Sequence, residues 1–240
     1  MDEELTYPVI EENPKHISNF FENLKDVTDL MDIHSVFSGN TRGRKFGLQT
    51  INKSCIVLLT ACWEAYIEEL VSESFDLLLD NADTHDVIPF GVLTKASNDL
   101  KSDKDSRKVW QLADLGWKSV MADYKQQIIE KEVDYFHVPR PDAIDELFEN
   151  LIGLKRITES WKWKNMTNQK AKKLLNDFVD LRGEIAHKLK ASRAVQMRDV
   201  KHYANIINAC GVISHNSSNA HLRNLIGIHP WPFYSFKSVS

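Results

Sequence analysis

Residues 51–79 read INKSCIVLLTACWEAYIEELVSESFDLLL, and their apolar positions recur every three or four residues. No glycine or proline follows Gly47 in this region, so the spacing predicts one long helix over about 46–79. The first half of this helix is apolar on almost every side, which is typical of a buried central helix. Its remaining face carries the acidic residues Glu64, Glu68, Glu69 and Glu73. The stretch therefore predicts a helical fold built around itself.

Helical spacing also dominates the rest of the chain, whereas strand-like alternation is scarce. Further helices are predicted over about 15–32, 91–100, 107–133, 141–152, 168–186 and 195–213. We expect one all-α domain over 1–240, with a core of about 15–80 and 141–215 and an insertion of about 81–140. The Pro/aromatic tail, residues 229–240, cannot be helical and packs either on the domain or on a partner.

The composition excludes several classes of protein. Of 240 residues, 42% are hydrophobic and 27% charged, as in an ordinary folded domain. A net charge of −4 excludes nucleic-acid binding by bulk charge, but not a local basic site. Three cysteines without a CxxC pair argue against a disulfide framework and a Cys-type zinc site. The N-terminus lacks the apolar core of a signal peptide, and no apolar run approaches the ~20 residues of a membrane span. We therefore expect a soluble, cytoplasmic protein without membrane contact.

The motifs of many enzyme classes are absent. The chain contains no HExxH, GxSxG, GxGxxG or phosphate-binding Gly-x4-Gly-Lys sequence, and its histidines lack metal-ligand spacing. No cofactor and no metal site is therefore expected. The charge, however, is unevenly distributed: residues 155–201 contain 13 basic and five acidic residues, a net charge of +8, whereas the rest of the chain carries −12.

Within this basic stretch, tryptophans alternate with lysines between Trp161 and Lys164. Such an arrangement favours stacking on bases beside cations that bind phosphates. The alternative is a solvated basic face with both tryptophans in the core. The candidate RNA-binding residues are Lys162, Lys164, Lys170, Lys173, Lys188, Trp161 and Trp163.

Arg182 and His187 lie late in the predicted helix of this stretch, and their chemistry suits RNA cleavage. An imidazole can take the proton of a 2′-hydroxyl or donate one to the leaving oxygen. A guanidinium can hold the phosphate with two hydrogen bonds and stabilise its added charge. Five residues turn a straight helix by about 500°, which leaves the two side chains about 140° apart. Convergence therefore needs either a distorted turn, which Gly183 permits, or a second copy across a two-fold axis.

Three blocks of the sequence resemble the HEPN superfamily, and in particular its RiboL-PSP-HEPN branch. Residues 174–187, LLNDFVDLRGEIAH, resemble the hydrophobic helix with Arg and Ala-His that is the superfamily's signature. Residues 148–154, FENLIGL, followed by Trp161, are similar to the segment before that motif in the branch. Residues 61–70, ACWEAYIEEL, resemble the branch's Trp-Glu-x-Tyr-hydrophobic-Glu helix. The blocks stand in the family's order and cover about 50–210.

The resemblance implies a HEPN-like antiparallel helical bundle that forms a homodimer, here with the helical insertion described above. It also implies a metal-independent endoribonuclease of the toxin or antiviral-defence type, acting on an RNA substrate, with Arg182 at the scissile phosphate and His187 as acid and base. Two Arg–His pairs would meet at the dimer interface. An antitoxin or an activating defence protein is the further partner that such an enzyme implies.

One departure from the family pattern concerns the position after the arginine, where Gly183 replaces a residue that is often Asn, Asp or His. Glu184 can act as the accessory group in its place, or it can simply pair with Lys188 one turn later. Glu64 can orient the Arg or His, or it can lie at the boundary between helix and solvent. Gly183 therefore keeps open a non-catalytic HEPN-like module that binds RNA, a nucleotide or a protein. A third interpretation is a helical adaptor that uses the insertion and the tail.

Overall fold

The computed structural model describes residues 13–38, 48–102, 104–134, 136, 138–188 and 194–236. Its longer helices are α1 (Lys15–Ser38), α2 (Leu48–Asn81), α3 (Phe90–Ser102), α4 (Gly116–Asp134), α5 (Pro141–Ile152), α6 (Asn168–Lys188) and α7 (Met197–Ile226). Short 3₁₀ helices are η1 (His85–Val87), η2 (Ser106–Leu112) and η3 (Ile157–Ser160). No strand occurs in these described ranges, where a single bridge joins Trp163 and Met166. The predicted all-α fold is confirmed.

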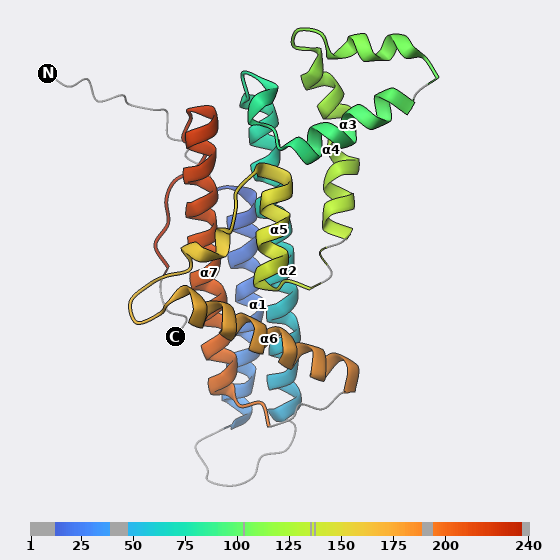
Figure 1. The fold of residues 1–240 in the computed structure, drawn as a ribbon. Coiled ribbons are helices and arrows are strands. Elements are labelled where there is room, and N and C mark those ends of the chain that lie inside the picture. The colour runs from blue at the N-terminus through green and yellow to red at the C-terminus, as the bar shows by residue number, and fades with distance from the viewer. Residues whose placement is uncertain are drawn as a thin grey trace, which may run out of the picture.

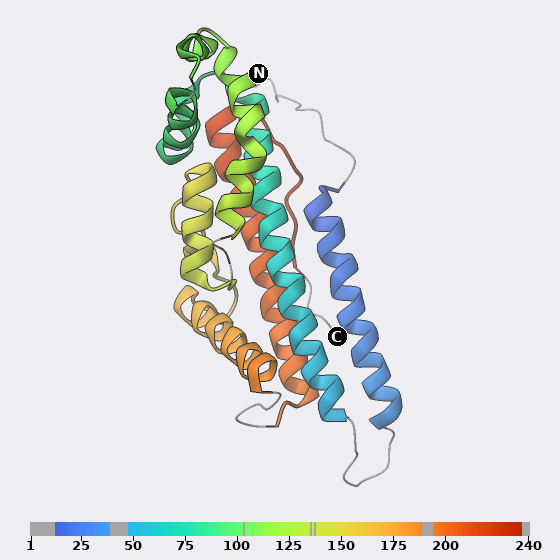
Figure 2. The ribbon, with the colours of Figure 1, turned by 90° about the vertical axis from the view of Figure 1, so that its right-hand side faces the viewer.

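The helices are arranged around α2, which runs through the middle of the molecule beside α7 (Figure 1). In Figure 2, α1 stands on one side of α2, whereas α5 and α6 lie on the other. The segment from α3 to α4 extends beyond one end of this arrangement. No helix of the described ranges is both long and apolar enough to span a bilayer.

Polar contacts show that α2 and α7 run in the same direction. The hydroxyl of Tyr66 donates to the carbonyl oxygen of Gly211 at 2.7 Å. Two turns further along α2, the hydroxyls of Ser74 and Ser218 lie 2.7 Å apart. The partner's number rises with the residue number, so the two helices are parallel. Each bond also satisfies a buried polar group that would otherwise be costly.

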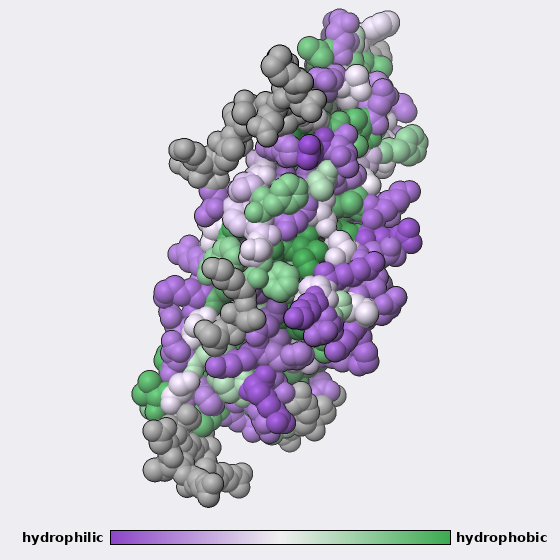
Figure 3. Space-filling view, turned by 90° about the vertical axis from the view of Figure 1, so that its left-hand side faces the viewer, coloured by the Kyte–Doolittle hydropathy of each residue, from purple (hydrophilic) through white to green (hydrophobic). Residues whose placement is uncertain are grey.

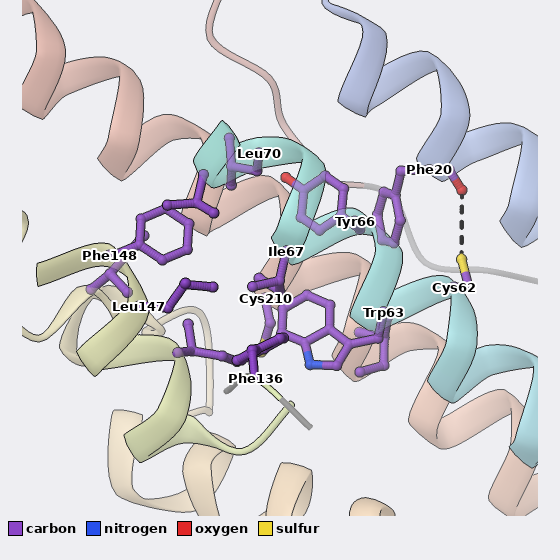
Figure 4. Close-up of a cluster of buried hydrophobic side chains, with 14 of the residues drawn as sticks. Phe20, Cys62, Trp63, Tyr66, Ile67, Leu70, Phe136, Leu147, Phe148 and Cys210 are labelled. Carbon is purple, nitrogen blue, oxygen red and sulfur yellow. Dashed lines mark hydrogen bonds between the residues drawn. The ribbon is translucent and has the colours of Figure 1, made fainter. Parts of the chain in front are cut away.

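Aromatic side chains fill the core around the middle of α2 (Figure 4). Trp63 and Tyr66 are buried, and the ring of Trp63 meets that of Trp161 edge-on at 6.0 Å. The ring of Phe20 in α1 packs on Tyr66 with centroids 4.2 Å apart. A Cβ at Gly211 would lie 2.9 Å from the Phe20 ring, so glycine allows this close approach of α1 to α7. α1 is therefore held on the pair α2 and α7 by its aromatic face.

The three cysteines behave as small buried side chains. Cys55, Cys62 and Cys210 are free and buried. Burial raises the pKa of Cys55 to about 11 and that of Cys62 to about 12, and it raises the pKa of Cys210 further. These thiols are therefore neutral at pH 7, and a nucleophilic thiolate is not expected at any of them.

The structure differs from the sequence prediction over 107–133, where one helical segment was expected. η2 and α4 are separated by a turn in which Asp114 has a φ of 52°. A Cβ at Gly116 would collide with the backbone carbonyl of Gln111, so glycine permits this turn. Helical spacing of the apolar residues continues across the break, which is why periodicity alone did not reveal it.

Candidate functional site

The helix α6 carries the Arg–His pair, and its first turn is capped by Thr167. The hydroxyl of Thr167 accepts a hydrogen bond from the backbone N–H of Lys170 at 3.3 Å, as an N-cap side chain does. The buried residues of its inner face are Ala171, Leu175, Phe178, Val179, Leu181 and Ile185. This apolar stripe fixes the rotation of α6 against the bundle, and hence the directions of its polar side chains.

Arg182 is half-buried and His187 is exposed, and both lie within the uninterrupted helix α6. Neither side chain forms a hydrogen bond or ion pair with any residue in the described part of the chain. The helix stays regular at Gly183, so the distorted turn considered from the sequence does not occur. In a regular helix the two side chains point about 140° apart and start about 7.5 Å apart along the axis. One chain therefore leaves both groups free without bringing them together.

Gly183 itself is not required by packing. A Cβ at this position would meet nothing within 4 Å, and the residue lies in an ordinary helical conformation. A polar side chain could therefore be accommodated here. The absence of one is a difference in chemistry rather than a consequence of the fold.

An apolar groove lies beside the pair, between α1 and α6, with α2 as its floor. Its volume is about 660 Å³. The lining residues are Leu30, Thr50, Lys53, Ser54, Val57, Leu58, Ala61, Ile185 and Ala186. Ala186 directly precedes His187 and follows Arg182 by one turn, so a molecule seated in the groove would lie next to both. Figure 2 shows α2 between α1 and α6 at this end of the bundle.

The two accessory candidates, Glu184 and Glu64, are both half-buried and both interact with other residues. Neither forms an ion pair with Arg182, which has no such partner in the described ranges. Sequence reasoning did not single out Glu68, one turn after Glu64 on α2. Burial, with the negative charges of Glu64 and Glu69, raises the pKa of Glu68 to about 7. The signal for it was the acidic spacing along an otherwise apolar helix.

The candidate RNA-binding lysines fall into two groups. Lys162, Lys164 and Lys170 are exposed, and their ammonium groups form no ion pair with any described residue. Lys173 is exposed too, but it pairs with Asp177 at 2.7 Å. Lys188 is the last residue of α6, and its side chain lies outside the described part of the structure.

The two candidate tryptophans differ in how deeply they are buried. Trp161 is fully buried, and its indole N–H donates to the hydroxyl of Ser214 at 2.9 Å. It is therefore a core residue and is not placed to stack on a base, which corrects the expectation from its alternation with lysines. Trp163 is half-buried and packs edge-on against Phe236, with ring centroids 5.9 Å apart. Trp163 and Met166 pair through their backbones, so Lys164 stands at the tip of a tight turn.

A comparison with protein families finds a match that covers most of this chain. The family model described as RiboL-PSP-HEPN matches residues 18–213. The matched range begins in α1, ends in α7, and contains α2, Arg182 and His187. No curated protein and no solved structure matches the chain.

Proposed function

Because the chain belongs to the RiboL-PSP-HEPN family, we propose that it is a metal-independent endoribonuclease of the toxin or antiviral-defence type. The family supports an RNA-related function of HEPN type in general. The proposal of ribonuclease activity rests on one observation, the absence of intramolecular partners for Arg182 and His187. Both lie on one uninterrupted helix, and neither is engaged by another described residue. An arginine and a histidine kept this free are available to a phosphate and to a proton.

The reaction needs only groups that this chain and its substrate supply. The 2′-oxygen of the RNA attacks the adjacent phosphorus, and the bond from phosphorus to the 5′-oxygen breaks. A neutral His187 takes the proton of the 2′-hydroxyl, and a protonated His187 gives one to the leaving 5′-oxygen. Arg182 holds the phosphate and stabilises its added charge. The products are a 2′,3′-cyclic phosphate and a 5′-hydroxyl end.

A homodimer supplies the two imidazoles and removes the difficulty of the helix geometry. Arg182 and His187 of one chain point about 140° apart, so a single copy does not surround one phosphate. A second copy seated across the groove would bring its own α6 to the first, next to Ile185 and Ala186. A two-fold axis there would place two Arg–His pairs around one substrate. Apolar lining suits such a contact between copies.

RNA would approach over the exposed lysines before α6 and at its start. Lys162, Lys164 and Lys170 are available for phosphates, and Trp163 lies between the first two in sequence. Glu184 and Glu64 are the proposed accessory groups, which would help to position Arg182 and His187. An unrestrained nuclease would damage its own cell, so an antitoxin or an activating defence protein is part of the proposal.

Gly183 favours a second candidate, a HEPN-like module that binds RNA, a nucleotide or a protein without cleaving it. The family often has a polar side chain after the arginine, and here the space for one is left open. Such a module would show salt-dependent binding of RNA but no product.

The test uses the wild type and His187→Ala, each incubated with total RNA and with tRNA in EDTA. His85→Ala is the matched control, because His85 is also an exposed histidine but lies in η1 within the predicted insertion. The proposal predicts cleavage by the wild type and the control, with 2′,3′-cyclic phosphate ends, and none by His187→Ala. Cleavage that survives His187→Ala would contradict it. Binding without cleavage by a folded dimer would support the second candidate.

A further inference from the structure

One face of α2 is left uncovered by the other helices along most of its length. Its residues recur every three or four positions, as one face of a helix requires, and all of them are exposed or half-buried. They include Ser54, Val57, Ala61, Glu64, Glu68 and Ser72. In Figure 2 this face lies between α1 on one side and α6 and α4 on the other. The face and its two walls are here called the α2 channel.

The α2 channel changes in chemistry along its length. One half is the apolar groove of about 660 Å³ that ends beside Arg182 on α6. The other half is a cavity of about 620 Å³ between the start of α1, the middle of α2 and the end of α4. Five carboxylates and one ammonium, that of Lys15, line this cavity. The carboxylates belong to Glu68, Glu69, Glu73, Asp76 and Glu130. The channel therefore has an apolar half and an acidic half.

The acidic half contains one carboxylate without a partner among the described residues. Four of the five carboxylates are paired within the chain: Glu69 with Asn19, Glu73 with His16, Asp76 with Lys125 and Glu130 with Gln126. Glu68 forms no hydrogen bond or ion pair in the described ranges. Burial and the negative charges of Glu64 and Glu69 raise its pKa to about 7. A cation brought to this point would compensate for a charge that the chain itself leaves unmatched.

The walls of the α2 channel determine the conformation of a segment that could enter it. Floor and walls are helices, whose backbone groups are hydrogen-bonded within each helix. An entering segment therefore meets side chains but no free N–H or C=O, unlike a strand that is added to the edge of a sheet. Its own backbone groups must pair internally, as they do in a helix. From Ser54 to Asp76 the channel is about 33 Å long, which is the length of a helix of about 22 residues.

Charge restricts the source of such a helix. Residues 1–12 contain five acidic and no basic side chains, so the acidic half would repel them. A second copy is assigned above to the apolar half. A two-fold axis at the acidic half would instead bring the same carboxylates face to face. The helix that fits both halves therefore comes from another protein and carries basic side chains at one end.

The opposite side of the bundle, shown in Figure 3, is closed by the chain itself. Residues 230–236 run along α7 there in an extended conformation. Asn216 forms hydrogen bonds with the backbone of Tyr234, and Asn219 forms them with the backbone of Trp231. The C-terminal tail thus packs on the domain as far as it is described. No segment of the described ranges covers the α2 channel in the same way.

We propose that the α2 channel is the docking site for a helix of a partner protein, apolar at the end beside Val57 and basic at the end beside Glu68. The apolar end would occupy the surface that the second copy needs. A docked helix would therefore keep the two Arg–His pairs apart, and the partner would be an inhibitor. The inhibitory role rests on the ribonuclease function proposed above, whereas the docking site does not.

Docking is measured by fluorescence anisotropy with the full chain and two labelled peptides of about 22 residues, built from alanine, leucine and lysine. In the first peptide, leucines occupy one face of the first half and lysines the same face of the second half. The second peptide has the reverse order, so that both directions of a helix in the channel are sampled. A third peptide carries glutamates in place of the lysines. We expect one of the first two peptides to bind and the third not to bind.

The informative variant is Glu68→Lys, which should weaken binding about ten-fold because it places a like charge against the lysines of the peptide. Glu146→Lys is the matched control, since Glu146 is an exposed carboxylate on α5, outside the channel, and the net charge changes equally. Failure of both lysine peptides to bind the wild type would overturn the proposal. Equal weakening in the two variants would do so too, because it would show attraction by net charge alone.

The inhibitory role is measured with the peptide that binds. At saturation it should convert wild-type dimers into monomers in light scattering and stop RNA cleavage, and Glu68→Lys should need about ten-fold more peptide for the same fractional inhibition. Cleavage that persists with the peptide bound would overturn the inhibitory role. If the peptide binds through Glu68 but the chain alone cleaves no RNA, the docking site is supported and the ribonuclease function is contradicted.

Discussion

Arg182 and His187 lie five residues apart on the uninterrupted helix α6, pointing about 140° away from each other, and neither binds another described side chain. Both side chains are therefore available to a partner outside the chain. The proposed partners are an RNA phosphate and a second copy of α6.

The groove beside the pair makes the dimer testable. Val57→Glu places a charge in the groove, where Val57 is 39% exposed, and should convert a dimer into a monomer and abolish cleavage. Burying an unpaired carboxylate in a contact costs several kcal/mol, more than most such interfaces tolerate. Val109→Glu is the matched control, since Val109 is 44% exposed in η2. Light scattering and the RNA assay measure both effects, and a Val57→Glu dimer of normal activity would place the interface elsewhere.

Free and paired lysines should contribute differently to RNA binding. Lys164→Gln removes an ammonium that forms no ion pair among the described residues, so the slope of log affinity against log salt should fall by about 0.7 per lost phosphate contact. Lys173→Gln should change it less, because Lys173 already pairs with Asp177. Fluorescence anisotropy over a salt series gives both slopes. Equal slopes for Lys164→Gln and the wild type would show that Lys164 does not contact an RNA phosphate.

The two tryptophans should contribute unequally to stability. Trp161→Ala removes a fully buried ring and leaves Ser214 without its partner, so the free energy of unfolding should fall by about 3–5 kcal/mol. Trp163→Ala should cost much less, because the ring is only half-buried. Urea unfolding followed by circular dichroism measures the difference. Similar losses for the two variants would be inconsistent with the burial described.

Glu68 should make the free energy of unfolding fall as the pH rises from about 4.5 to just above 7. Its pKa is about 7 in the folded chain and near 4.5 when unfolded, so the folded state holds the proton more tightly. The stabilisation is complete below pH 4.5 and is lost as the pH rises through 7. Allowing for solvent screening, the free energy of unfolding of the wild type should fall by on the order of 1 kcal/mol between pH 6 and pH 9. In Glu68→Gln this fall should be absent. Urea unfolding at these two pH values provides the measurement, and an unchanged dependence in the variant would refute the assignment.

Several helix boundaries could be predicted from residues close to them in the sequence. The helix predicted over 141–152 is α5, which begins at Pro141 and ends before Gly153 with its φ of 72°. Proline in the first turn and glycine after the last residue are both consequences of backbone sterics that act within a few residues.

The features that could not be predicted depend on contacts between residues that are far apart in the sequence. His16 and His215 are 199 positions apart, and nothing in their sequence neighbours indicates that their rings share a hydrogen bond. Trp161 and Trp163 look alike in sequence, but the turn at 163–166 directs them to different environments. Periodicity reports which face of a helix is apolar, but not which loop side chain enters the core.

The proposed ribonuclease activity is tested most directly by RNA cleavage in EDTA by the wild type, His187→Ala and the control His85→Ala, with analysis of the fragment ends. The proposed mechanism predicts fragments with 2′,3′-cyclic phosphate and 5′-hydroxyl ends from the wild type and the control. It predicts none from His187→Ala, whose fold should be unchanged because His187 is exposed and forms no hydrogen bond or ion pair with a described residue. Undiminished cleavage by His187→Ala would contradict it.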